Sequence, residues 1–200
     1  MKSAIAGNAV GQFKLGYCYE YGIGTFEDEI KAIKWYLKSA ENGYATAQGN
    51  LGHYFQYGKG TAKNEAKAFE WYTKSANGGS ALGQCSLGFC YESGIGTYID
   101  KTLAFRWYLT AAENGNIVAQ YNLGYCYSNG IGTIKNKVKA FEWYLKSAEG
   151  GIAAAQNYVG NFYYDGIGVV KNVDKAIYWF RKALDNGIYE AKYKLAKILP

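Results

Sequence analysis

The stretch LGYCYEYGIGTFEDEIKAIKWY, residues 15–36, decides the fold because its pattern returns four more times along the chain. Its tryptophan marks the period, since the chain's tryptophans are spaced 36 residues apart, at Trp35, Trp71, Trp107, Trp143 and Trp179. Self-similarity at a fixed period of this size is typical of stacked units that bury their apolar faces against their neighbours. The sequence therefore predicts a repeat array, whose function lies on a long shared surface.

Two helices per unit follow from the columns that share this period. In the first unit Leu15, Gly16 and Tyr19 share one side of a helix, and the glycine lets a neighbouring backbone approach. Glycines then break the helix and supply the backbone angles of a tight turn. The next helix starts at an N-cap residue in every unit: Asp28, Asn64, Asp100, Asn136 and Asn172. We expect helix A over 9–21 and helix B over 29–42, with equivalent helices in each later unit.

One string of residues recurs in register in all units. In the first unit it reads Leu15-Gly16-x-x-Tyr19-x-x-Gly22-x-Gly24, followed by Asp28, Lys31-Ala32, Trp35-Tyr36, Lys38 and Gly43. This string resembles the Sel1-like repeat, a relative of the tetratricopeptide repeat with a slightly longer unit, and the resemblance covers essentially the whole chain. It implies an all-α fold, a right-handed α/α superhelical solenoid of five 36-residue helix-turn-helix repeats. It also implies an adaptor or scaffold for protein complexes.

The register also predicts the boundaries. We expect one solenoid domain over 1–200 without a linker, with repeats at 8–44, 45–80, 81–116, 117–152 and 153–188. Residues 1–7 match the end of a helix B, so we interpret the chain as a fragment of a longer protein. Residues 189–200 match a helix A with added lysines, which is typical of the polar capping helix that a solenoid needs for solubility.

Composition and cysteine columns indicate the compartment. With 49% hydrophobic residues the chain reads as globular, and no run approaches the roughly 18 apolar residues of a membrane span. Cys18, Cys90 and Cys126 share one helix-A column, where packed helices hold the Cα atoms too far apart for a disulfide. Secreted members of the resembled family join two cysteines in each repeat, but those columns here hold alanines and glutamines: Ala40, Ala76, Ala112 and Ala148 against Gln48, Gln84, Gln120 and Gln156. We therefore expect reduced thiols and a cytoplasmic or other reducing compartment.

Residues for catalysis are scarce. His53 is the only histidine, we find no His/Cys cluster for zinc and no Ser-His-Asp set, and we interpret it as a polar surface residue. The Gly-x-Gly strings recur as turns and lack the Gly-Lys-Ser/Thr of a phosphate-binding loop. Lysines on helix B are interspersed with glutamates and the net charge is only +6, which favours a solvated face over nucleic-acid binding. We expect no catalytic residue, no metal and no cofactor.

One side of helix A carries residues that are unusual for a solvated face. If the side with Leu15 faces the core, the opposite side carries positions related by i, i+4, i+7 and i+11. In superhelices of the resembled kind this side forms the concave wall. Its candidate partner-binding residues are Lys14, Tyr17, Tyr21, Asn50, His53, Tyr57, Phe89, Asn122, Tyr125, Tyr158 and Asn161.

Two interpretations of this stripe stay open. In the first, the rings pack sideways against the next helix A. In the second, rings and asparagine amides form a groove that binds an extended peptide or a partner helix. We favour the second, and predict a non-catalytic protein-protein interaction scaffold. The alternatives are a spacer segment of a larger multidomain signalling protein, an uncharacterised enzyme and a nucleic-acid-binding solenoid.

Overall fold

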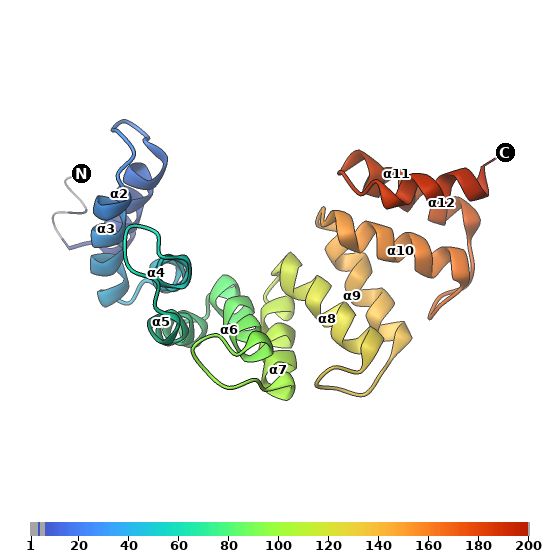
Figure 1. Cartoon of the computed structure of the whole chain (residues 1–200), viewed down its shortest axis with the longest axis horizontal. Coiled ribbons are helices and arrows are strands. Elements are labelled where there is room, and N and C mark those ends of the chain that lie inside the picture. The colour runs from blue at the N-terminus through green and yellow to red at the C-terminus, as the bar shows by residue number, and fades with distance from the viewer. Residues whose placement is uncertain (1–3, 5–6, 200) are drawn as a thin grey trace. The chain divides into compact units, whose positions relative to one another are not determined.

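The structure, a computed structural model, describes residue 4 and residues 7–199 of the chain. These residues form helices joined by loops, so the predicted all-α fold is confirmed (Figure 1). Contacts divide the chain into two compact units, and the division falls between Trp107 and Tyr108, within helix α7 (Lys101–Glu113). Each unit is described by itself below, and the single continuous solenoid stays a prediction.

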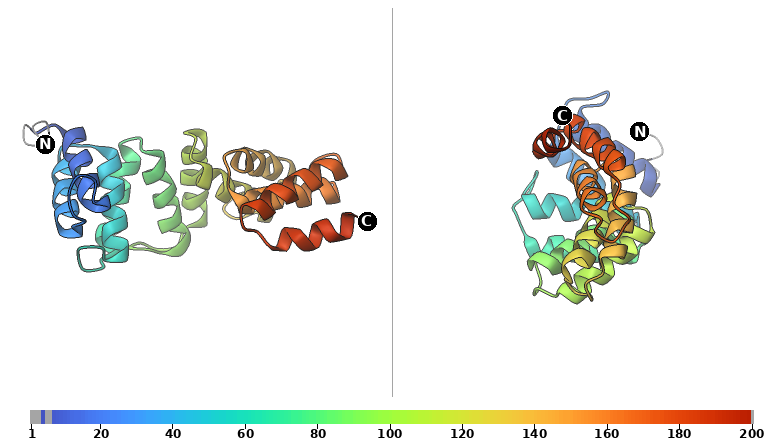
Figure 2. Two further views of the ribbon diagram at one scale, coloured as in Figure 1. Left: turned by 90° about the horizontal axis from the view of Figure 1, so that it is seen from above. Right: turned by 90° about the vertical axis from the view of Figure 1, so that its right-hand side faces the viewer.

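The helices alternate between helix A and helix B of successive repeats. The first unit contains α2 (Ala9–Tyr21), α3 (Glu29–Glu41), α4 (Ala45–Tyr57), α5 (Glu65–Asn77) and α6 (Ala81–Ser93). The second contains α8 (Ile117–Asn129), α9 (Lys137–Glu149), α10 (Ala153–Asp165), α11 (Val173–Asp185) and α12 (Glu190–Ile198). Within each unit every helix packs on the next along the chain, and the further views show the same neighbours (Figure 2). The helix ends predicted for the first repeat agree with α2 and α3 to within about one residue.

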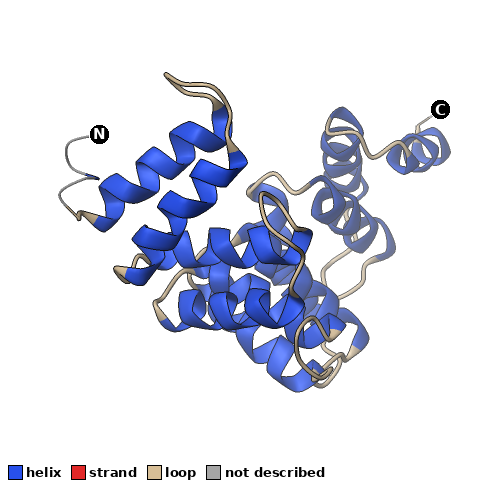
Figure 3. Ribbon diagram, turned by 60° about the vertical axis from the view of Figure 1, so that its left-hand side comes forward, coloured by secondary structure: helices blue, strands red, loops and turns tan. Residues whose placement is uncertain are grey.

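Side-chain caps and glycines set the helix ends, as the sequence predicted, and Figure 3 shows the loops that join the helices. The Asp28 carboxylate accepts a hydrogen bond from the Lys31 amide at 2.8 Å and starts α3. The same bond recurs at the start of each later helix B, where the side-chain oxygen of the cap accepts from a backbone amide: Asn64, Asp100, Asn136 and Asn172. At the other end of α2, Gly22 adopts φ +64° and its amide donates to the Cys18 carbonyl. Local residue chemistry therefore defines the repeat before any packing is considered.

A ring from helix B seated on a glycine of helix A forms the centre of each described core. Tyr36 has 0% of its surface exposed, and a Cβ atom built on Gly16 would lie 2.8 Å from its Cδ1 atom. The backbone carbonyl oxygen of Ala32 lies 3.2 Å from the same Cβ position. The glycine therefore admits a neighbouring backbone, as predicted, and also the tyrosine ring. A Cβ atom built on the equivalent glycine of further repeats would overlap the equivalent ring: Gly52 with Tyr72, Gly124 with Tyr144, and Gly160 with Phe180.

The tryptophans that mark the period lie beside the core. Trp71 and Trp107 are partly buried and pack against neighbouring clusters, whereas the residue after each tryptophan is the fully buried one. Those buried residues are Tyr36, Tyr72, Tyr108, Tyr144 and Phe180. Trp179 is the exception among the described tryptophans, with only 7% of its surface exposed. The other four are partly exposed and cover the core from outside.

Lysines of helix B lie over aromatic rings. The Lys31 ammonium is 5.4 Å from the centre of the Tyr19 ring, and the Lys38 ammonium is 4.5 Å from that of Trp35. Equivalent pairs recur in later repeats: Lys67 with Phe55, Lys74 with Trp71, Lys139 with Tyr127, Lys146 with Trp143, Lys175 with Tyr163 and Lys182 with Trp179. Cation–π attraction of this kind stabilises the outer face. The lysines are all exposed, in agreement with the predicted solvated face, and the ring contacts are an addition to it.

Two polar contacts join successive repeats. The Gln48 side-chain amide donates to the Ala40 carbonyl at 3.1 Å, in the columns where secreted relatives are expected to carry cysteines. The same bond links Gln84 to Ala76, Gln120 to Ala112 and Gln156 to Ala148. In addition, the Gly60 amide donates to the Glu29 carboxylate. Gly60 has φ +59°, and a Cβ atom built on it would lie only 2.9 Å from the Glu29 carbonyl oxygen. A side chain at residue 60 would separate the two repeats.

The described parts of both chain ends follow the repeat. Of residues 1–7, Ala4 and Gly7 are described and the others lie outside the described residues. Gly7 has φ +84°, close to the +81° of Gly43, as expected for the end of a helix B. At the other end, the helix predicted for 189–200 is observed as α12, with exposed Lys192 and Lys197.

The ring-on-glycine contact predicts a double-mutant cycle. Gly52→Ala should destabilise the protein by about 1–3 kcal/mol, because the new methyl group overlaps the Tyr72 ring. Tyr72→Ala should cost about 3–5 kcal/mol, the range for large aromatic cores. In the Tyr72→Ala background, however, Gly52→Ala should become neutral or gain up to about 1 kcal/mol from helix propensity. Urea unfolding measures the free energy of unfolding of the parent, the two single variants and the double variant. Additive effects of the two changes would contradict the contact.

Candidate functional site

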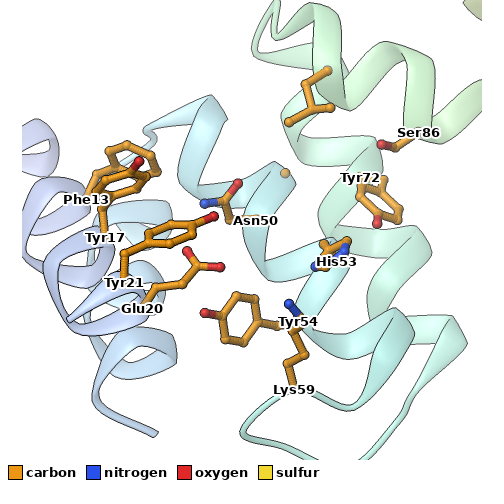
Figure 4. Close-up of a pocket in the computed structure, with 12 residues that line it drawn as sticks. Phe13, Tyr17, Glu20, Tyr21, Asn50, His53, Tyr54, Lys59, Tyr72 and Ser86 are labelled. Carbon is orange, nitrogen blue, oxygen red and sulfur yellow. The ribbon is translucent and has the colours of Figure 1, made fainter. Parts of the chain in front are cut away.

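A pocket of about 370 Å³ opens on the helix-A side of the first unit (Figure 4). We name it the α2–α4 pocket, because most of its wall comes from these two helices. Its lining residues are Phe13, Tyr17, Glu20, Tyr21, Gly49, Asn50, His53, Tyr54, Lys59, Tyr72, Leu82 and Ser86. The volume lies within the range of pockets that hold small ligands or side chains, and the wall is rich in tyrosine.

A carboxylate and a hydroxyl lie within this aromatic wall. The Tyr36 hydroxyl, from the core, donates to the Glu20 carboxylate at 2.5 Å. Tyr54 is 1% exposed, and its buried hydroxyl has no hydrogen-bond partner among the described residues. In Figure 4 the Tyr54 hydroxyl points toward the side of the pocket where Glu20 lies. Glu20 raises the pKa of Tyr54, so the carboxylate and this hydroxyl lie near each other in the wall of the pocket.

Burial and charge shift the pKa values in this pocket. Burial, followed by the nearby Glu20, raises the pKa of Tyr36 and of Tyr54. Partial desolvation, followed by the positive charge of Lys59, lowers the pKa of His53, against the opposing effect of Glu20. This shift favours the neutral imidazole, and the other ionisable groups in the wall besides the tyrosines are Glu20 and Lys59.

The pocket brings together part of the predicted stripe. Tyr17, Tyr21, Asn50 and His53 line it, and the Tyr17 and Tyr21 ring centres are 4.5 Å apart. Tyr57 extends the surface, because its ring centre lies 4.6 Å from that of His53 and 61% of the residue is exposed. These residues form one continuous surface on α2 and α4.

Two predicted residues of the first unit lie outside the pocket. Phe89 is 42% exposed on α6, the helix that also supplies Leu82 and Ser86 to the pocket wall. Lys14 lines a different hollow of about 320 Å³ on α2, together with Val10 and Cys18. Lys14 is thus separate from the group of tyrosines to which the sequence assigned it.

The predicted residues of the second unit divide between surface and packing. Tyr125 is exposed on α8 and Asn122 is half-buried. Tyr158 stacks on the core ring Tyr144, with ring centres 4.7 Å apart and an interplanar angle of 1°. Asn161 is half-buried, and its side-chain oxygen has no hydrogen-bond partner among the described residues. Tyr158 therefore packs on the core, and its ring centre also lies 6.1 Å from that of Tyr121 on α8, the neighbouring helix A.

Sequence reasoning missed Glu20 and Tyr54, because neither column belongs to the stripe opposite the side with Leu15. A signal was present in the register. The column of Glu20 holds Gln56, Glu92, Ser128 and Tyr164 in later repeats, and the column of Tyr54 otherwise holds cysteine or phenylalanine. Variable polar residues in a buried column indicate a position that the fold does not fix.

A second missed feature is a column of exposed apolar residues at the tips of the loops between helix A and helix B. Phe26 is 92% exposed, and the residues that follow it at the repeat spacing are also exposed: Ala62, Tyr98, Ile134 and Val170. The 36-residue register was the signal here too, since large apolar residues recur at four of the five positions.

The part of the chain made up of residue 4 and residues 7–199 holds no group of three or more His, Cys, Asp or Glu residues that could bind a metal ion. Its helices include none that is long and apolar enough to cross a membrane.

The repeat geometry defines the class of protein, an all-α helix-turn-helix repeat protein. The Sel1 repeat model matches residues 9–44, 45–80, 81–116, 117–152 and 153–188. The chain therefore belongs to the Sel1 repeat family, and the resemblance predicted from the sequence is confirmed.

Solved structures agree with this family. The chain is 34% identical to a protective antigen of uropathogenic Escherichia coli with an SLR fold, covering 98% of this chain and 42% of that one, with a TM-score of 0.91. It is 35% identical to a Sel1 repeat protein from Oxalobacter formigenes, covering 96% and 76%, with a TM-score of 0.85. An immunity protein of Pseudomonas aeruginosa, Pa5087, shares the fold at 21% identity, with coverage of 92% and 67% and a TM-score of 0.61. No curated protein matches the chain.

The buried tyrosines predict a loss of stability in alkali. Burial raises the pKa of Tyr36, Tyr54, Tyr72 and Tyr144 above the ordinary value of 10.0, so folding favours the neutral phenols. Their contribution is complete below pH 10 and is lost as the pH rises further. Urea unfolding at about pH 8 to 12, with tyrosinate absorbance as a second readout, should show the free energy of unfolding falling above pH 10.

A matched variant is available for this titration. The Tyr144 hydroxyl has no hydrogen-bond partner among the described residues, and Phe180 occupies the same column one repeat later. Tyr144→Phe should therefore reduce the alkaline loss without lowering stability at neutral pH. Titration of every tyrosine near pH 10 in the folded protein would contradict the burial.

Proposed function

We propose that the protein is a non-catalytic scaffold that binds a peptide or a helix of a partner protein on the helix-A side of its first unit. The observation that carries this proposal is the exposure of large rings on three successive A helices. Tyr17 and Tyr21 lie on α2, Tyr57 on α4 and Phe89 on α6, and all four are exposed. Single exposed rings are ordinary, but a row of them beside a pocket is typical of an interaction surface.

The chemistry of this surface suits a protein ligand. Tyrosine offers a large apolar ring with little loss of side-chain freedom on binding, and it dominates interface hot spots. The half-buried Asn50 amide, on the pocket wall, can pair with the main chain of an extended peptide. Surface shape and hydrogen-bonding groups therefore both favour a polypeptide.

Family membership supports the same proposal, because Sel1 repeats typically bind proteins. The relatives are a protective antigen and an immunity protein, and these roles belong to those proteins. The chain spans 42% of the length of the antigen, so the partner and the assembly of the whole protein are part of the proposal.

Truncation of the exposed rings tests the proposal. Partners are captured from native extract by the intact chain, identified by mass spectrometry, produced in pure form and titrated by calorimetry. The double variant Tyr57→Ala, Phe89→Ala should weaken binding by about 2 kcal/mol or more, because such rings act as hot spots. The melting temperature should change little, since both rings are largely exposed.

A control variant on the opposite side is Lys34→Glu, an exposed residue of α3. Lys67 and Lys74 are unsuitable because each lies over a ring of the outer face. Loss of binding in Lys34→Glu with unchanged binding in the ring variant would show that the partner uses helix B. Loss of folding in the ring variant would show that the rings serve packing.

We also propose a cytoplasmic or other reducing compartment. No disulfide joins Cys18, Cys85, Cys90 or Cys126, and the columns of the expected disulfide carry the Gln–Ala hydrogen bond instead. Burial, the largest effect, raises the pKa of Cys85 and of Cys90 to about 12, so both are kept as unreactive thiols.

Thiol titration tests this proposal. In the native protein Cys18, which is half-buried, should react first, while the three buried thiols should react only on unfolding. The Cys18→Ser variant should lose the fast phase alone. A disulfide between any two of the four cysteines in protein purified without reductant would overturn the proposed compartment.

A further inference from the structure

The α2–α4 pocket offers a set of groups that the repeat does not need. In the second repeat Gln56 occupies the position of Glu20, and its side-chain oxygen accepts from the Tyr72 hydroxyl at 2.7 Å. A neutral amide therefore satisfies the core tyrosine as well as a carboxylate does. The negative charge at residue 20 is therefore not required for the hydrogen bond to the core tyrosine, and it lies in a wall of rings.

The rings around this charge favour a cation. Tyr17, Tyr21 and Tyr54 line the pocket together with Glu20, and the face of an aromatic ring carries a negative quadrupole. A cation in this pocket is attracted by the rings and by the carboxylate at the same time. An anion would be repelled by both, and the only lysine or arginine that lines the pocket is the exposed Lys59.

The unpaired Tyr54 hydroxyl supplies a second, independent observation. It is buried, lines the pocket and lacks a hydrogen-bond partner among the described residues. A phenol oxygen accepts hydrogen bonds, and so do the free lone pairs of the Glu20 carboxylate. A planar group with several N–H donors fits two acceptors placed in this way.

We propose that the α2–α4 pocket binds a cationic side chain of the partner, an arginine or a lysine, through Glu20, the Tyr54 hydroxyl and the surrounding tyrosine rings. This inference rests on the proposed protein-binding function and adds the chemical class that the first unit selects. The apolar part of the incoming side chain lies along Tyr17 and Tyr21, and its charged end reaches Glu20. The Lys59 side chain is long and exposed, so it turns toward solvent as the ligand enters.

NMR titration of the isotope-labelled full chain with N-acetyl-arginine N-methylamide tests the proposal. Amide signals of residues 17, 20, 21, 50 and 53 should shift together. The neutral isostere N-acetyl-citrulline N-methylamide should bind about tenfold more weakly, because it lacks the charge. The aspartate derivative should not bind in the pocket.

Glu20→Gln is the decisive variant, since Gln56 shows that glutamine keeps the tyrosine hydrogen bond. It should weaken arginine binding about tenfold with an unchanged melting temperature. Tyr54→Phe, which keeps the ring, should weaken it by a smaller factor, and Glu41→Gln on the exposed end of α3 should leave it unchanged. Equal binding of arginine and citrulline, equal binding by Glu20→Gln, or pocket binding of the aspartate derivative would each overturn the inference.

The outcomes separate this inference from the proposed function. If the ring variant loses the captured partner but arginine does not bind the pocket, the cation inference fails and the scaffold stands. If arginine binds through Glu20 but no captured partner depends on Tyr57 and Phe89, the cation site stands and the scaffold fails.

Discussion

The seating of a helix-B ring on a helix-A glycine is the contact on which the repeat depends. A Cβ atom at Gly52 would lie 2.5 Å from the Tyr72 ring, so neither partner tolerates growth of the other. The contact sets how closely the two helices of a repeat approach. It also directs the ring hydroxyl to the last turn of helix A, where Tyr36 meets Glu20 and Tyr72 meets Gln56. The core thereby positions a polar group at the edge of the candidate site.

Much of the fold could be predicted because its signals are local. Asp28 caps α3 through its own side chain, and Gly22 ends α2 through its own backbone angle, so each can be recognised without the rest of the structure. The choice between Trp35 and Tyr36 could not be predicted in the same way. Adjacent residues of a helix point about 100° apart, and periodicity shows that both columns matter without showing which one faces inward. The cation–π contact of Lys38 lets Trp35 stay partly exposed.

The candidate site was predicted less completely, because it depends on neighbours that only folding supplies. The stripe at Tyr17, Tyr21 and His53 followed from helical spacing. Tyr158 has the same spacing and yet stacks on Tyr144, a contact that depends on side-chain conformations in another helix. Glu20 and Tyr54 belong to different repeats, and no pattern within one repeat could show that they line the same pocket.

A repeat protein separates residues that fold from residues that bind more clearly than other proteins do, because each column is a set of internal substitutions. Columns held in every repeat, such as the helix-B cap and the ring on glycine, carry the fold. Columns whose residue changes from repeat to repeat are free to provide binding residues that only one repeat has. Position 20 shows the distinction, since Phe180 lacks a hydroxyl altogether and its repeat still forms the same helix pair with Tyr164 in that column. The charge is kept at Glu92 but is replaced in three repeats without loss of the fold, so it is best explained by what it binds.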